Sequence, residues 1–263
     1  MEITHDGAKV YVATGSKDFN PALPSITFLH GAGMDHSVWT LFARHFARHG
    51  CNSLAFDLAG HGRSGGTCKA TIGEWAQWVD GVLGTLGVEK TAIVGHSMGS
   101  LVALETAARY PARITKAVLV GFGYPMAVGQ PLLDAAQANH HDAVDMMIIW
   151  GHDYYAQFGA SGVPAMSTIN VWKRVLERAG PGVIYADLNA CHTYTGGEEA
   201  AGLIQCPVTI VSGDRDRMTP VKGAKDFLRH LPKAKLEILA ECGHGLMEER
   251  PEGLHKALVT ALG

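Results

Sequence analysis

Short and almost unbroken apolar runs recur along the chain, with longer stretches between them. They cover residues 25–30, 51–57, 91–95, 117–120, 207–211 and 235–239. A strand covered on both faces has such a run, whereas a strand with one exposed face alternates between apolar and polar residues. The runs therefore predict strands of a buried sheet. A further segment, residues 9–14, predicts an N-terminal hairpin.

The stretches between these runs have helical periodicity. Over residues 38–49, one face of the expected helix would carry Val38, Leu41, Phe42, His45 and Phe46. The next helix would begin at Thr71, with Glu74 as its capping-box partner. Further helices are predicted over residues 98–110 and 251–262. Alternating strands and helices indicate right-handed crossovers and a mainly parallel sheet, so the predicted fold class is α/β.

Residues 124–205 break this alternation. They show helical periodicity at 131–140, 143–150 and 169–179 but no convincing strand. We therefore predict a helical insertion over residues 124–205 in a core formed by residues 1–123 and 206–263. The insertion is rich in aromatic and methionine side chains, which would pack onto the core or line a pocket beneath the insertion: Trp150, Tyr154, Tyr155, Phe158, Trp172, Met146, Met147 and Met166.

Composition narrows the classes of function. The length of 263 residues fits one large domain, and a hydrophobic content of 47% supplies a sizeable core. The formal net charge is −3 and no stretch is rich in Lys and Arg, which argues against a nucleic-acid partner. No apolar stretch reaches the roughly 18 residues that a membrane span needs. A small molecule is therefore the expected ligand.

The N-terminus and the cysteines indicate the cellular setting. The first residues have neither the basic nor the apolar region of a signal peptide. The five cysteines lie far apart and form no C-x-x-C pair, so that we expect no metal site and no redox pair. These features predict a cytoplasmic protein with reduced cysteines.

The strongest local signal is the pentapeptide Gly95-His96-Ser97-Met98-Gly99, a G-x-S-x-G motif. It follows a predicted strand and opens a predicted helix, which is the context of a nucleophile elbow. Ser97 would occupy a strained turn with positive φ, and the two glycines would let the strand and the helix approach closely. The turn would expose the Ser97 hydroxyl as a nucleophile.

A serine hydroxyl needs a base to accept its proton, and that base needs an acid to orient it. His244 lies between glycines directly after the last predicted strand, where α/β sheets place their ligands. The loop after the run at 207–211 offers Asp214 and Asp216. We choose Asp216 because it lies further into the loop. Asp214, by contrast, is placed to cap the turn or to pair with a neighbouring arginine.

An oxyanion formed by nucleophilic attack needs aimed donors. The N–H of Met98 is expected to be one of them, because it begins a helix. The other is expected from the loop after the first buried strand, where we choose Ala32 over Gly33. The Gly-rich segment 57–64 is interpreted as architecture in which Asp57 and Arg63 hydrogen-bond a loop, with no catalytic role for His61.

Taken together, these motifs resemble the successive signatures of the α/β-hydrolase superfamily. They occur in the order nucleophile, acid, base and span nearly the whole chain: His30-Gly31-Ala32-Gly33, Asp57 with Gly60-His61-Gly62-Arg63-Ser64, the elbow around Ser97, Gly213 with Asp216 and Pro220, and Gly243-His244. The resemblance implies that residues 124–205 form the lid, or cap, before the last two strands. Small bacterial esterases, enol-lactonases and perhydrolase-like members are the most similar subgroup.

The expected activity is hydrolysis of a small carboxylic ester through an acyl-enzyme on Ser97, with no metal or organic cofactor. The same triad would also serve a lactone, a thioester or a C–C bond, and the motifs do not distinguish among these. A hydrolase-like receptor that only binds its ligand is the alternative from another class. The natural substrate and the oligomeric state are not indicated by the sequence.

Overall fold

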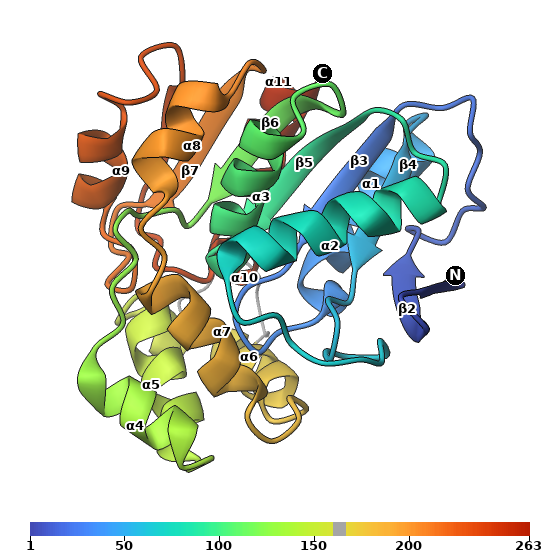
Figure 1. Ribbon diagram of the computed structural model, residues 1–263. Coiled ribbons are helices and arrows are strands. Elements are labelled where there is room, and N and C mark those ends of the chain that lie inside the picture. Colours follow the sequence, from blue (N-terminus) through green and yellow to red (C-terminus); the bar gives the residue numbers. More distant parts are fainter. Residues whose placement is uncertain (160–166) are drawn as a thin grey trace.

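The fold is an eight-stranded, mostly parallel sheet covered by helices on both faces (Figure 1). The computed structural model describes residues 1–159 and 167–263. The strands run in the spatial order β1-β2-β4-β3-β5-β6-β7-β8. Pairs β1–β2 and β2–β4 are antiparallel, and all later pairs are parallel. The strands are β1 (Glu2–His5), β2 (Ala8–Ala13), β3 (Ser25–Leu29), β4 (Asn52–Phe56), β5 (Thr91–His96), β6 (Ile114–Val120), β7 (Val208–Gly213) and β8 (Lys235–Leu239).

Every predicted strand of the parallel sheet is confirmed, but the two ends of the sheet differ from expectation. The N-terminal hairpin is longer than predicted and begins at Glu2. Its turn is Asp6-Gly7, and both residues have positive φ, which is the geometry of a tight two-residue hairpin turn. Strand β8 is largely exposed rather than covered on both faces, because it is an edge strand.

The helices of the core include the four that were predicted, one of them with a corrected buried face, and two short helices that were not predicted, at residues 221–227 and 246–249. They are η1 (His36–Trp39), α1 (Thr40–Arg48), α2 (Ile72–Thr85), α3 (Met98–Arg109), α9 (Val221–Phe227), α10 (Leu246–Glu249) and α11 (Pro251–Leu262). The capping box of Thr71 and Glu74 is formed. Leu41 was expected on the buried face, but 63% of its surface is exposed. The 3₁₀ turn of η1 has fewer residues per turn than an α-helix, which displaces Leu41 from the buried face.

The insertion between β6 and β7 contains helices and no strand among its described residues. It contains α4 (Gln130–Gln137), α5 (Asp142–Gly151), η2 (Ala156–Phe158), α6 (Thr168–Leu176), α7 (Val183–His192) and α8 (Gly197–Leu203). The periodicity predicted α4, α5 and α6, whereas α7 and α8 were not predicted. Helices α4 to α7 gather beyond the carboxyl ends of the strands, and α8 returns to lie along α3 (Figure 1). Met166 lies outside the described residues.

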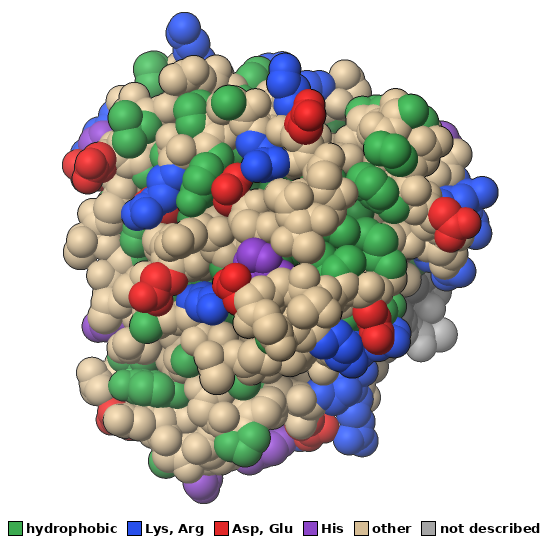
Figure 2. Space-filling view, turned by 45° about the vertical axis from the view of Figure 1, so that its right-hand side comes forward, with side chains coloured by type: hydrophobic (Ala, Val, Ile, Leu, Met, Phe, Trp, Pro, Cys, Tyr) green, Lys and Arg blue, Asp and Glu red, His purple; other side chains and the backbone are tan. Residues whose placement is uncertain are grey.

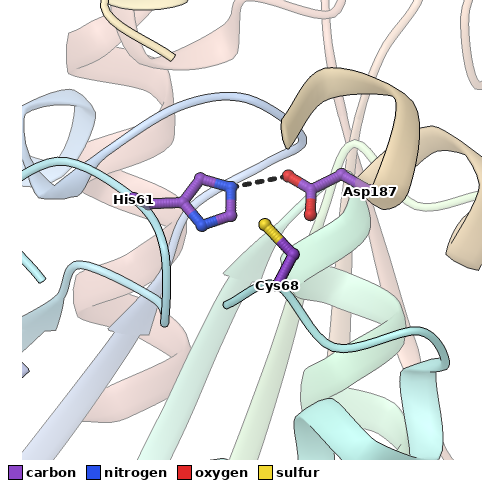
Figure 3. A group of neighbouring side chains, drawn as sticks. All are labelled: His61, Cys68 and Asp187. Carbon is purple, nitrogen blue, oxygen red and sulfur yellow. Dashed lines mark hydrogen bonds and ion pairs between the residues drawn. The ribbon is translucent and has the colours of Figure 1, made fainter. Parts of the chain in front are cut away.

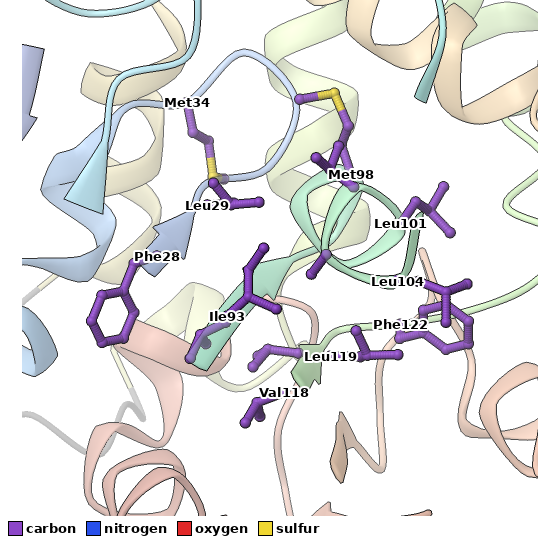
Figure 4. Close-up of a cluster of buried hydrophobic side chains, with 14 of the residues drawn as sticks. Phe28, Leu29, Met34, Ile93, Met98, Leu101, Leu104, Val118, Leu119 and Phe122 are labelled. Carbon is purple, nitrogen blue, oxygen red and sulfur yellow. The ribbon is translucent and has the colours of Figure 1, made fainter. Parts of the chain in front are cut away.

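The core below the insertion holds the β5–α3 turn in place. Phe28, Ile93 and Val118 project from neighbouring strands and are fully buried with Leu101 and Leu104 of α3 (Figure 4). Full burial of one such side chain stabilises a fold by about 1.5–3 kcal/mol. The turn at residue 97 is therefore supported by close-packed side chains of the core.

The distribution of charged side chains on the surface agrees with the nearly equal numbers of basic and acidic residues. Basic and acidic side chains are interspersed over the face in Figure 2. Within the described residues, none of the helices has the length and apolar character needed to cross a bilayer.

Candidate active site

Ser97 occupies a sharp turn between the end of β5 and the start of α3. Its backbone has φ 53° and ψ −118°, which a non-glycine residue rarely adopts. A Cβ on Gly95 would overlap the carbonyl oxygen of Gly99, and a Cβ on Gly99 would lie 2.6 Å from the carbonyl oxygen of His30. The glycines are therefore required by the close approach of α3 to β5 and β3. The Ser97 N–H donates to the carbonyl of Val120 at 2.9 Å.

His244 lies in the loop between β8 and α10 and is almost completely buried. Its Nδ1 is 2.7 Å from Oδ2 of Asp216. Its Nε2 is buried and has no hydrogen-bond partner among the described residues. Ser97 and His244 line the same cavity, although no hydrogen bond joins their side chains in the described part of the chain. The structure thus brings a buried imidazole with a free Nε2 to the cavity that holds the elbow serine.

Asp216 is held in place by donors from its own loop. Its Oδ1 accepts the N–H groups of Met218 and Thr219, both at 2.8 Å, and its Oδ2 accepts the Thr219 hydroxyl at 2.7 Å. Burial alone would raise the pKa of Asp216, but the His244 ring and these donors hold it below its usual value. Asp214 is exposed, and its carboxylate accepts the N–H of Cys242 at 3.1 Å. Of the two aspartates, Asp216 is therefore the one that contacts His244.

Thr219 is a site residue that the sequence analysis missed. Its hydroxyl lies 2.7 Å from Oδ2 of Asp216 and 3.1 Å from Nδ1 of His244. The only local signal is a threonine after an aspartate in a turn, a pattern in which the side chains bond the nearby backbone. That pattern does not reveal the contact with His244.

The loop after β3 contains both candidates for the second oxyanion donor. The N–H of Gly33 donates to Oδ2 of Asp187 at 2.8 Å. By contrast, no hydrogen bond among the described residues engages the N–H of Ala32 or of Met98. The His30 ring fixes the start of this loop, because its Nε2 accepts the Leu58 N–H and its Nδ1 is 2.9 Å from the Gly31 carbonyl. Burial lowers the pKa of His30 to about 4, so the ring is neutral at pH 7.

The segment 57–64 has the predicted architectural role through Asp57 and the backbone of Arg63, but not through the Arg63 side chain. Asp57 accepts the backbone N–H groups of His36 and Arg63, at 2.7 and 2.8 Å. The Arg63 guanidinium points elsewhere, toward Glu2 at 3.1 Å and over the Tyr11 ring. His61 is buried against Asp187, away from the cavity.

The loop of His244 is also tied to the insertion. The Gly151 carbonyl, at the end of α5, accepts the N–H groups of His244 and Gly245 at 2.8 and 3.0 Å. The buried carboxylate of Glu249 accepts the N–H groups of Gly243, Gly245 and Asp153 at 3.0–3.2 Å. The contacts of Gly151 and Asp153 join segments that are distant in sequence, and the sequence analysis did not predict them.

The cavity above Ser97 and His244 has a volume of about 230 Å³ and lies between the sheet and the insertion. Its lining is mainly apolar and includes Met34, Met126, Leu132, Met147, Trp150, Trp172, Leu188 and Met218, with Arg217 as a basic member. Of the aromatic and methionine side chains named from the sequence, Met147, Trp150 and Trp172 line the cavity. Tyr154, Tyr155 and Phe158 are exposed instead of packed.

Trp172 is anchored at the cavity by a buried acid. Its indole Nε1 donates to Oε2 of Glu248 at 2.8 Å. Burial raises the pKa of Glu248 to about 8. Between the ordinary pKa of a glutamate and pH 8, Glu248 therefore keeps its proton in the folded protein but loses it in the unfolded chain. The free energy of unfolding decreases as the pH rises through this range.

Replacement of Glu248 by glutamine tests this pH dependence. The amide oxygen can still accept from Trp172, but no proton is linked to folding. We expect the loss in melting temperature between pH 6 and pH 9 to be smaller in Glu248→Gln than in the wild type. The exposed Glu252→Gln serves as the control and should behave as the wild type. Equal pH dependence of all these proteins in thermal melts would contradict the assignment.

The sequence profile described as the alpha/beta hydrolase fold matches residues 24–251. The chain belongs to this family. This α/β-hydrolase is 26% identical, over 91% of its length and 87% of the relative, to a 2-hydroxy-6-oxononadienedioate/2-hydroxy-6-oxononatrienedioate hydrolase of Paraburkholderia phymatum. It is also 26% identical to a pimeloyl-(acyl-carrier protein) methyl ester esterase of Aromatoleum aromaticum, over 87% of this chain and 94% of the relative.

Solved structures agree on the fold of this α/β-hydrolase. The enol-lactonase from Burkholderia xenovorans superposes with a TM-score of 0.87 at 20% identity, covering 100% of this chain and 99% of that one. A thermophilic esterase superposes with a TM-score of 0.80 at 25% identity, covering 100% of this chain and 96% of the esterase. The names of these proteins describe hydrolases of several bond types.

Proposed function

We propose that this α/β-hydrolase cleaves a small carboxylic ester through an acyl-enzyme on Ser97. The observation that carries the proposal is the buried Asp216–His244 pair, whose free Nε2 lines one apolar cavity with the elbow serine. The cavity volume of about 230 Å³ fits a small substrate. Residues 124–205 would act as its cap. A cytoplasmic location stays a prediction from the sequence.

In the proposed mechanism, Oγ of Ser97 attacks the acyl carbon and His244 Nε2 accepts the hydroxyl proton. His244 then gives this proton to the leaving alcohol. A water molecule then attacks the acyl-enzyme while His244 accepts a water proton, and His244 passes this proton to Oγ of Ser97 as the carboxylic acid leaves. Asp216 keeps the Nδ1–H of the ring oriented and stabilises the imidazolium.

The N–H groups of Met98 and Ala32 would bind the oxyanion. Met98 supplies an N–H from the first turn of α3, where backbone donors lack partners within the helix. Ala32 is favoured over Gly33 because the N–H of Gly33 is engaged by Asp187. Each such donor contributes about 3–4 kcal/mol to stabilisation of the transition state in serine hydrolases.

Labelling with a fluorophosphonate tests the proposal and separates an enzyme from a receptor that only binds. The activated hydroxyl should attack phosphorus and displace fluoride, which leaves one covalent adduct per chain. Peptide mapping should place the adduct on Ser97, and His244→Ala should abolish it. Ser37→Ala is the control for loss of a hydroxyl outside the cavity and should be labelled at the wild-type rate. An unlabelled wild type, or an adduct on another residue, would reject the proposed nucleophile.

Cleavage of a C–C bond is the second candidate, because a relative at 26% identity is named as a 2-hydroxy-6-oxononadienedioate hydrolase. The same triad would serve that reaction. The exposed Arg217 at the cavity is the basic side chain that could meet a substrate carboxylate. A panel of neutral esters, lactones, thioesters and vinylogous keto acids would rank these classes by kcat/KM.

A further inference from the structure

A second cluster of reactive side chains lies outside the cavity, where the loop after β4 meets α7 (Figure 3). His61 and Cys68 come from this loop, and Asp187 comes from α7. One donor atom from each residue lies within 4.8 Å of the others. His61 and Asp187 are buried, whereas Cys68 is only half-buried. The cluster is thus enclosed on the side of the core and reachable past the thiol.

The His61 ring is held as metal-binding histidines usually are. Its Nδ1 is 3.1 Å from the Ala59 carbonyl, and its Nε2 points at Asp187, 2.7 Å from Oδ2. In metal sites the ring nitrogen that is not a ligand commonly donates to a backbone carbonyl, which leaves Nε2 for the ion. The orientation of His61 therefore suits coordination through Nε2.

Asp187 provides the observation that points to a missing ligand. Its Oδ2 accepts the N–H of Gly33 and contacts His61, but its Oδ1 is buried without a hydrogen-bond partner among the described residues. A buried carboxylate oxygen without a donor is costly. In Figure 3 the Cys68 sulfur points into the space between this carboxylate and the imidazole. A cation in that space would satisfy Oδ1.

We propose that His61 Nε2, Cys68 Sγ and Asp187 Oδ1 bind a Zn²⁺ ion, with water as the fourth ligand. Thiolate and imidazole ligands favour Zn²⁺ over Mg²⁺ and Ca²⁺. Donors on a tetrahedral zinc ion, with bonds of about 2.0–2.3 Å, lie about 3.3–3.8 Å apart. A separation of 4.8 Å therefore has to close by about 1.0–1.5 Å, and the 2.7 Å contact between His61 Nε2 and Asp187 Oδ2 has to open. Binding releases the thiol proton and the proton shared by His61 and Asp187.

The ion would connect the core to the insertion next to the loop of Ala32. His61 and Cys68 precede α2, Asp187 lies in the insertion, and Asp187 also holds the N–H of Gly33. The absence of a C-x-x-C pair does not bear on this site, because its ligands come from separated segments. Its role would be structural, since none of the three residues lines the cavity.

Metal binding is tested on the full chain after treatment with a chelator. We expect one equivalent of Co²⁺ to produce a thiolate-to-cobalt absorption band, and Zn²⁺ to displace it and raise the melting temperature. Cys68→Ser should lose the band and bind Zn²⁺ more than about 10-fold more weakly. Cys206→Ser, which changes another half-buried cysteine, should keep both properties.

Asp187→Asn gives a second test that does not depend on the thiol. It should weaken Zn²⁺ binding while Cys68 is still present. Absence of the cobalt band in the wild type, or an unchanged band in Cys68→Ser, would overturn the proposal. Equal Zn²⁺ affinity of Asp187→Asn and the wild type would overturn it as well. These readouts do not use ester hydrolysis, so they are independent of the proposed enzymatic function.

Discussion

Ser97→Ala is expected to lower kcat for a short p-nitrophenyl ester by at least about 10,000-fold. The variant lacks the oxygen that would form the acyl-enzyme, so that only direct attack by water remains. Alanine adopts the φ of 53° at this turn with the same strain as serine. The melting temperature should therefore stay close to that of the wild type. Steady-state rates and a thermal melt of the same preparation measure both quantities.

Ser37→Ala provides the comparison for this variant, because it removes a hydroxyl that bonds Asp35 outside the cavity. It should keep the wild-type kcat. Hydrolysis by Ser97→Ala at close to the wild-type rate would reject Ser97 as the nucleophile.

Asp216→Asn should reduce kcat by about 10,000-fold. Oδ1 of Asp216 accepts the N–H groups of Met218 and Thr219, so the oxygen of the new amide must stay on that side. The amide NH₂ then faces Nδ1 of His244, which has to become an acceptor. The ring is forced to carry its proton on Nε2 and cannot accept the proton of Ser97. The rate of acylation measured in a stopped-flow burst would show this loss directly.

Asp214→Asn is the matched control in the same loop. The Asp214 carboxylate accepts a single backbone N–H, from Cys242, and an amide oxygen can replace it. We expect less than about a 10-fold decrease in kcat, since a single neutral hydrogen bond contributes about 1 kcal/mol. Similar losses in the two variants would mean that the acid had been assigned to the wrong residue.

The sequence predicted the Asp216–His244 contact from the order of the motifs, and other features from local sterics. The glycines at 95 and 99 have no room for a Cβ, and this constraint is visible as a motif. The capping box at Thr71 is equally local. The buried strands were predicted from their apolar runs because both faces of most of them are covered.

The contacts that the sequence could not predict join distant segments. Thr219 reaches His244 only because β7 and β8 are neighbours in the sheet. The Trp172–Glu248 bond links the insertion to α10 across a large sequence separation. Leu41 was placed on the wrong face because a 3₁₀ turn precedes α1, and a regular helical period cannot anticipate that change. Tertiary packing therefore decided the two contacts, and a local change of helix type decided the position of Leu41.

The bonds from the Gly151 carbonyl limit how substrate can reach the cavity. If α5 moved away as a rigid body, the backbone N–H groups of His244 and Gly245 would lose their acceptor, although Asp216 and Thr219 would still contact the imidazole. Such a movement would disturb the backbone of the residue that we propose as the general base. We therefore expect any opening of the cavity to leave the end of α5 in place and to move other helices of the insertion.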